Sequence, residues 1–166
     1  MTTPAMRALR QCSDGRHLTL LTSSSAAKLA PHLNMVDDVW AFDAPWVKHP
    51  VTSSVDADLD MIEKLRAGRF DAAVIFTVYS QSPLPAAMMC RLAGIPLRLA
   101  HCRENPYALL TDRIAETEPH NGTRHEVQRQ LALVQSVGAL ASDERLGFDV
   151  LRHDRLAVAQ RLAAGR

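Results

Sequence analysis

Two short polar segments carry the side chains best suited to binding a ligand. They are Ser80-Gln81-Ser82 and His101-Cys102-Arg103-Glu104-Asn105, and each follows an apolar run. Hydroxyl and amide groups hydrogen-bond to sugar hydroxyls, and a guanidinium binds a carboxylate or phosphate through two parallel hydrogen bonds. Because open α/β sheets bind ligands at the carboxyl ends of their strands, we predict one site there. Its predicted residues are Ser80, Gln81, Ser82, His101, Arg103, Glu104 and Asn105.

The same side chains also have a purely structural interpretation, which the sequence leaves open. Ser82 stands before Pro83, a pair typical of a helix start. Arg103 can instead form an ion pair with Glu104 or Asp112 on a solvated loop. The position of this second segment, directly after a predicted strand, favours the ligand interpretation.

A further pair of candidates lies later in the chain. Arg124 and His125 stand within Thr123-Arg124-His125-Glu126, which has the T-x-x-E form of a capping box at a helix start. The helix dipole disfavours a cation in the first turn, and an anionic ligand would offset that cost. We therefore predict an anion contact at Arg124 and His125, with simple solvent exposure as the alternative.

The elements that position these segments alternate between strands and helices. The apolar runs at 18–21, 72–76 and 97–100 are typical of parallel strands covered on both faces, and 36–42 predicts a weaker strand near a sheet edge. Helices are predicted over 26–30, 58–67, 82–94, 125–137 and 154–164. This alternation implies right-handed crossovers and an α/β fold with a mostly parallel sheet.

Composition excludes several classes of protein. The formal net charge is +1 and the 19 lysines and arginines are dispersed, so nothing favours a nucleic-acid partner. Cys12, Cys90 and Cys102 have no metal-ligand spacing, and their odd number argues against a disulfide framework, so we expect no metal and a reducing compartment. No apolar run approaches the ~20 residues of a transmembrane helix.

The order and spacing of several motifs resemble those of family-9 glycosyltransferases, the ADP-heptose:lipopolysaccharide heptosyltransferase group. The most distinctive is AGIPLR, which leads into HCREN and later into RHE at the start of a long predicted helix. The resemblance extends over most of the chain. The segments that carry it are 4–10, 18–21, 70–73, 93–98, 101–105 and 124–126.

This resemblance implies a domain organisation. Members of the family have a GT-B architecture, in which an N-terminal Rossmann-like domain takes the acceptor and a C-terminal one takes the nucleotide-sugar. By that likeness, residues 1–150 form a Rossmann-like acceptor-side domain and 151–166 form a helix leading toward a donor-binding domain. The first strand, and a following loop that carries the family's general base, have no counterpart here. No catalytic residue is therefore assigned, and we expect the chain alone to be inactive.

The resemblance also implies partners and a location. The complete enzyme would transfer a sugar, expected to be heptose, from an ADP-sugar to a saccharide or lipid-linked acceptor, without a separate cofactor. It would be cytoplasmic and peripheral at the inner membrane. The alternative is a non-catalytic remnant or binding domain that associates with a partner. Without the first strand, we expect the chain to self-associate or to fill the gap with residues 1–11.

Overall fold

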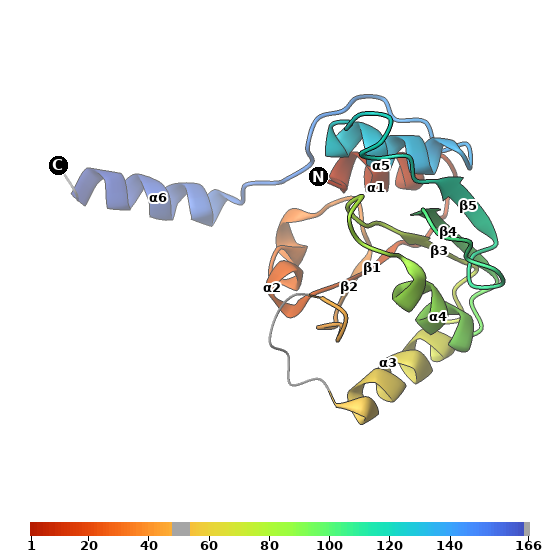
Figure 1. Cartoon of the computed structure of the whole chain (residues 1–166). Helices are drawn as coiled ribbons and strands as arrows, with labels where there is room; N and C mark the ends of the chain where they lie inside the picture. Colours follow the sequence, from red (N-terminus) through yellow and green to blue (C-terminus); the bar gives the residue numbers. More distant parts are fainter. Residues whose placement is uncertain (48–53, 165–166) are drawn as a thin grey trace.

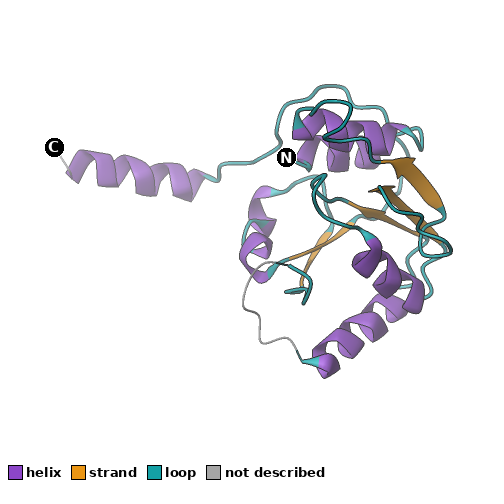
Figure 2. Ribbon diagram, viewed as in Figure 1, coloured by secondary structure: helices purple, strands orange, loops and turns teal. Residues whose placement is uncertain are grey.

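The computed structural model of the protein, which describes residues 1–47 and 54–164, has parallel strands flanked by helices (Figure 2). This confirms the α/β class. The strands are β1 (Thr19–Thr22), β2 (Asp38–Ala41), β3 (Ala72–Ile75), β4 (Leu97–Cys102) and β5 (Asp112–Ala115). All three pairings between them are parallel. The predicted runs at 18–21, 72–76 and 97–100 thus coincide with β1, β3 and β4.

The strands form two sheets where a single sheet was expected. One sheet has the order β1-β2, and the other has the order β3-β4-β5. The strand predicted near an edge, β2, is indeed an edge strand of the smaller sheet. β4 is the central strand of the larger sheet and is almost wholly buried, as expected for a strand with a partner on each side.

Within residues 1–47 and 54–164, seven helical segments accompany these strands. They are α1 (Thr3–Gln11), α2 (Ser24–Ala27), the 3₁₀ turn η1 (Ala30–His32), α3 (Val55–Ala67), α4 (Leu84–Leu92), α5 (Glu126–Gln135) and α6 (Arg152–Ala164). Local sequence explains their ends. Ser54 caps α3 by accepting a hydrogen bond from the Ala57 N–H at 3.2 Å. Gly94 follows α4 with a φ of 80°, a left-handed conformation that ends a helix.

Helices cover both faces of the strands (Figure 1). On one face, α1 and α5 bury a cluster that includes Ala8, Leu9 and Leu131, and Leu18, just before β1, and Val74 of β3 pack against it. On the other face, α3 and α4 bury a second cluster. Its members are Met61, Leu65, Met89, Ala93 and Ile95, and Leu21, Trp40 and Ala73 pack against it.

The N-terminal segment does not fill a gap in the sheet, and that prediction is wrong. Residues Thr3–Gln11 form α1, which begins with Pro4 in its first turn and buries Ala5, Ala8 and Leu9 beside α5. Proline suits the first turn of a helix, and small apolar residues spaced three and four apart give the helix one apolar face. The self-association expected as the alternative stays a prediction.

The predicted capping box at the start of α5 is also wrong. α5 begins at Glu126, its N-cap is His125, and no side chain caps it. Glu126 instead accepts hydrogen bonds from the side chains of Arg129 and Gln130. Arg124 and His125 therefore precede the helix and do not lie in its first turn.

The C-terminal helix α6 extends away from the rest of the chain (Figure 1). None of its described residues is buried, and Leu156, Val158 and Leu162 are each more than half exposed. Among the described residues, no helix is long and apolar enough to cross a membrane.

Candidate functional site

A polar hollow of about 120 Å³ opens where β3 and β4 end. Six of the seven residues predicted from the sequence line it: Ser80, Gln81, Ser82, His101, Arg103 and Glu104. Tyr79 and Glu116 complete the lining. Pockets for drug-sized ligands measure about 300–1,000 Å³, so this hollow has room for only part of a larger ligand.

Arg103 holds the walls of this hollow together. Its Nη2 donates to the Tyr79 carbonyl at 3.1 Å and to the Glu118 carbonyl at 2.7 Å. It thereby ties the turn after β3 to the segment after β5. In the part of the chain that the structure describes, the Arg103 Nε and Nη1 groups have no partner, so they are the groups that can bind a ligand oxygen.

Ser82 takes a structural role close to the predicted one. The N-cap of α4 is Pro83, one residue later than expected, but the Ser82 hydroxyl still accepts from the Leu84 N–H at 3.3 Å. The Glu104 carboxylate lies close enough to interact with the same hydroxyl. Backbone hydrogen bonding from the Glu104 N–H lowers the pKa of that carboxyl, so Glu104 is ionised at neutral pH.

The other predicted residues do not line the hollow. Asn105 turns its side-chain oxygen to the Tyr107 N–H at 3.0 Å, which makes a local turn. Arg124 forms an ion pair with Glu118, its Nε lying 2.9 Å from the carboxylate. Glu118 is therefore the anionic partner of Arg124, a role that was predicted for an external ligand. His125 is exposed.

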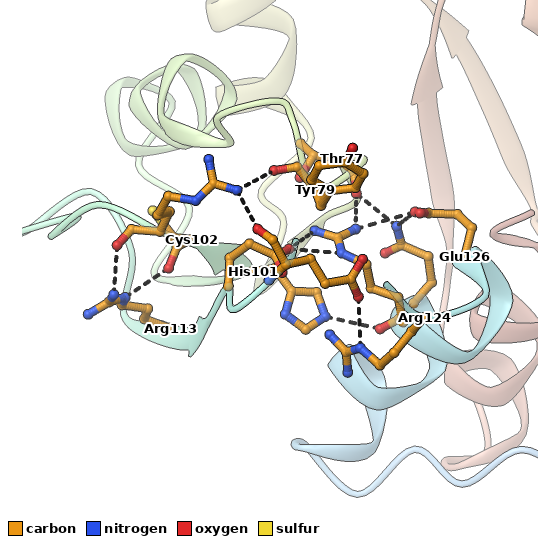
Figure 3. A network of polar contacts seen from close by, with 12 residues as sticks. Thr77, Tyr79, His101, Cys102, Arg113, Arg124 and Glu126 are labelled. Carbon is orange, nitrogen blue, oxygen red and sulfur yellow. Dashed lines mark hydrogen bonds and ion pairs between the residues drawn. The ribbon is translucent and has the colours of Figure 1, made fainter. Parts of the chain in front are cut away.

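A buried charged network lies behind the hollow (Figure 3). The Arg129 side chain is 1% exposed and donates from Nε, at 2.8 Å, and from Nη2 to one oxygen of Glu116. Its Nη1 donates to the Thr77 carbonyl, which also accepts from Gln130 Nε2 at 2.9 Å. Arg129 thus joins α5 to the carboxyl ends of β3 and β5. The network fixes Glu116, the residue that it shares with the hollow.

His101 connects the network to the hollow and is held as a neutral imidazole. Its Nε2 donates to the Arg129 carbonyl at 3.0 Å, so its Nδ1 is left as an acceptor. Nδ1 is buried and has no partner among the described residues. Burial lowers the pKa of His101, and this effect outweighs the hydrogen bond to the Arg129 carbonyl, which raises it.

The neutrality of His101 gives a testable pH dependence. We expect long-range proton–nitrogen NMR correlations to show the Nε2–H tautomer at pH 7 and a protonation midpoint below 6.5, the ordinary pKa of histidine. Because the folded pKa is the lower one, the unfolded chain binds the proton first. His101 should therefore contribute stability above pH 6.5 that declines as the pH falls toward the folded pKa. A doubly protonated imidazole at pH 7 would contradict this assignment.

Sequence reasoning missed Glu116, Arg129 and Gln130. Glu116 follows β5, a four-residue edge strand whose sequence DRIA has no apolar run to reveal it. Gln130 had a signal, because it lies on the inward stripe of α5 with Val127 and Leu131 at helical spacing. A polar residue on such a stripe is buried and needs a hydrogen-bond partner.

Comparison with known proteins identifies the fold. The chain matches no protein-family model, and no curated protein matches its sequence. Its structure is similar to that of E. coli ADP-heptose lipopolysaccharide heptosyltransferase II, with a TM-score of 0.69 and 15% sequence identity. The chain has the fold of part of a heptosyltransferase. The similarity covers 97% of this chain and 46% of the enzyme, so the chain spans about half the length of its neighbour.

Proposed function

We propose that this protein is the acceptor-side part of a heptosyltransferase-type glycosyltransferase, with the polar hollow as its acceptor site. The observation that carries the proposal is the position of the hollow. It lies at the carboxyl ends of β3 and β4, where open α/β sheets bind ligands, in a fold shared with a heptosyltransferase.

The chemistry of the hollow suits a saccharide. Glu104, ionised, accepts hydrogen bonds at the lining of the hollow. Gln81 and Ser80 offer both donors and acceptors, and Arg103 adds a cationic donor. Several hydroxyls on one sugar ring can bond to such a mixed set, whereas an apolar ligand cannot. The small volume favours one edge of a ring over an entire oligosaccharide.

The rest of the proposed reaction depends on residues outside this hollow. We propose that residues 1–150 form the acceptor side and that 151–166 lead toward a donor-binding domain. The complete enzyme would bind an ADP-sugar there and transfer heptose to a saccharide or lipid-linked acceptor from the cytoplasmic face of the membrane. Such a transfer needs a base at the acceptor hydroxyl and donors at the leaving diphosphate.

Gln81 gives a clean test of saccharide binding. Among the described residues its side chain has no hydrogen-bond partner, so its removal leaves internal bonds intact. We expect the methyl glycoside of heptose to shift backbone amide signals of the hollow in an NMR titration. Gln81→Ala should weaken that binding about three- to tenfold, the contribution of one hydrogen bond.

Gln128→Ala is the matched control. Gln128 lies on α5, outside the hollow, and bonds to Glu144 at 3.3 Å. Its substitution should leave the affinity unchanged. Shifts confined to other surfaces, or equal affinities of the Gln81→Ala and unmodified chains, would reject the hollow as the acceptor site.

A further inference from the structure

Arg113, on the edge strand β5, binds the backbone at the point where β4 ends. Its Nε donates to the Cys102 carbonyl at 3.0 Å, and its Nη2 donates to the Arg103 carbonyl at 2.9 Å (Figure 3). A guanidinium offers several donors in a fixed planar fork, so one side chain can bind two carbonyls at once. Arg113 therefore fixes the backbone from which Arg103 and Glu104 of the polar hollow extend.

The two carbonyls that Arg113 binds show that the chain turns directly after β4. The Cys102 carbonyl also accepts from the Glu116 N–H at 3.2 Å, so it points toward β5. Carbonyls of successive residues point to opposite sides of an extended strand, so a continued strand would direct the Arg103 carbonyl toward β3. It instead points toward β5, where Arg113 lies. In the described part of the chain, Arg113 is the one residue that donates to it.

The residues of this turn supply one wall of the polar hollow. The Arg103 side chain reaches the Tyr79 and Glu118 carbonyls. Glu104 lines the hollow, and its carboxylate accepts hydrogen bonds from two groups of the same turn. They are its own N–H and the Cys102 thiol, whose Sγ lies 3.4 Å from Oε2. The backbone conformation over 102–104 therefore determines both where Glu104 lies and how far its pKa is lowered.

We propose that Arg113 is a positioning residue of the acceptor site, because it holds the turn that places Arg103 and Glu104 in the polar hollow. Arg113 itself does not line the hollow, so it acts through these two residues. Its replacement should therefore weaken binding without removing a group that contacts the saccharide. That the ligand is a saccharide rests on the proposed function, whereas the turn is a property of the free chain.

Arg113→Met tests the turn in the absence of ligand. The carboxyl ¹³C signal of Glu104 is followed by NMR as the pH is changed. In the unmodified chain we expect a titration midpoint below 4.5, the ordinary pKa of this group, because the Glu104 N–H stabilises the ionised carboxylate. Arg113→Met releases the turn, so the midpoint should rise toward 4.5. Arg113 is exposed, so the circular dichroism spectrum should remain that of the folded chain.

Two matched variants identify the cause of that rise. Arg113→Lys keeps the positive charge but replaces the planar fork with a single ammonium, so the Glu104 midpoint should rise as it does in Arg113→Met. Arg91→Met removes an exposed arginine whose Nη1 donates, at 3.0 Å, to the Ala108 carbonyl later in the same loop. It should leave the Glu104 midpoint unchanged.

Three results of this titration would overturn the proposal. The first is an unchanged Glu104 midpoint in Arg113→Met, and the second is an equal rise in Arg91→Met. The third is a rise in Arg113→Met that is absent from Arg113→Lys, because charge alone would then explain it.

The methyl glycoside of heptose measures the consequence for binding. Arg113→Met should weaken its affinity about three- to tenfold, the contribution of one hydrogen bond, because Arg103 and Glu104 are displaced. Arg91→Met should leave the affinity unchanged. An unchanged affinity in Arg113→Met would overturn the role of Arg113 in the acceptor site. If the unmodified chain does not bind the glycoside, the proposed function fails, whereas the Glu104 titration still decides whether Arg113 holds the turn.

Discussion

Replacing Arg129 by methionine should lower the free energy of unfolding by about 3–5 kcal/mol, the usual cost of leaving one member of a buried ion pair without its partner. The side chains of Arg129 and Glu116 are 1% and 3% exposed, so water cannot solvate the remaining carboxylate. The Thr77 carbonyl loses a donor at the same time. Urea denaturation followed by circular dichroism measures the change.

Two further variants identify the cause of that loss. The double variant Arg129→Met/Glu116→Leu removes both charges and should recover much of the stability, since no unpaired charge is then buried. Arg145→Met breaks an ion pair whose arginine side chain is 87% exposed, and it should cost less than about 1 kcal/mol. Equal losses of stability in the Arg129→Met and Arg145→Met variants would show that burial of the Arg129–Glu116 pair does not increase the cost of breaking it.

The pair also has a pH signature. Burial by itself would raise the pKa of Glu116, but hydrogen bonds from the Glu118 N–H and Arg129 outweigh it and hold the pKa below its ordinary value. A lowered carboxyl pKa gives stability that is present above the unfolded pKa of 4.5 and is lost as the pH falls through the folded value. The double variant lacks this carboxyl, so its stability should fall less steeply in acid.

The sequence was sufficient wherever one local signal determined an element. Continuous apolar runs located β1, β3 and β4, because a strand covered on both faces contains few polar residues. The acids, the apolar stripe and Gly68 located α3, although the helix begins three residues earlier than predicted, after Ser54. For the same reason the loops that follow β3 and β4 could be predicted to lie together, and residues of both loops line the polar hollow.

The sequence was insufficient where contacts between distant residues determine the structure. Thr123 and Glu126 have the sequence pattern of a capping box. In the structure, however, the Glu126 side chain accepts hydrogen bonds from Arg129 and Gln130, and the capping box does not form. Arg124 forms an ion pair with Glu118. These two residues lie close together because of the path that the chain takes after β5, which the sequence does not predict. The sequence likewise does not predict the division into two sheets. An apolar run such as AAVI in β3 is compatible with one neighbouring strand or with two.

Leu131→Ala should lower the free energy of unfolding by about 2–5 kcal/mol, because truncating a fully buried leucine removes its apolar contacts and leaves a cavity. Leu131 is 4% exposed and lies in the cluster that joins α5 to α1 and that Leu18, next to β1, and Val74 of β3 contact. The matched control is Leu140→Ala. Leu140 is 71% exposed, so its truncation should change stability by no more than about 0.5 kcal/mol.

The magnitude of the Leu131 effect also tests how the two sheets are held together. β1 and β3 are not hydrogen-bonded to each other, so the apolar clusters, which residues from both sheets contact, connect the sheets through side-chain packing. A cavity under α5 weakens one of these clusters directly. If the Leu131→Ala loss stays below about 1 kcal/mol, the site is not packed as tightly as its burial indicates. The edges of β1 and β3 must then be held by contacts other than this cluster.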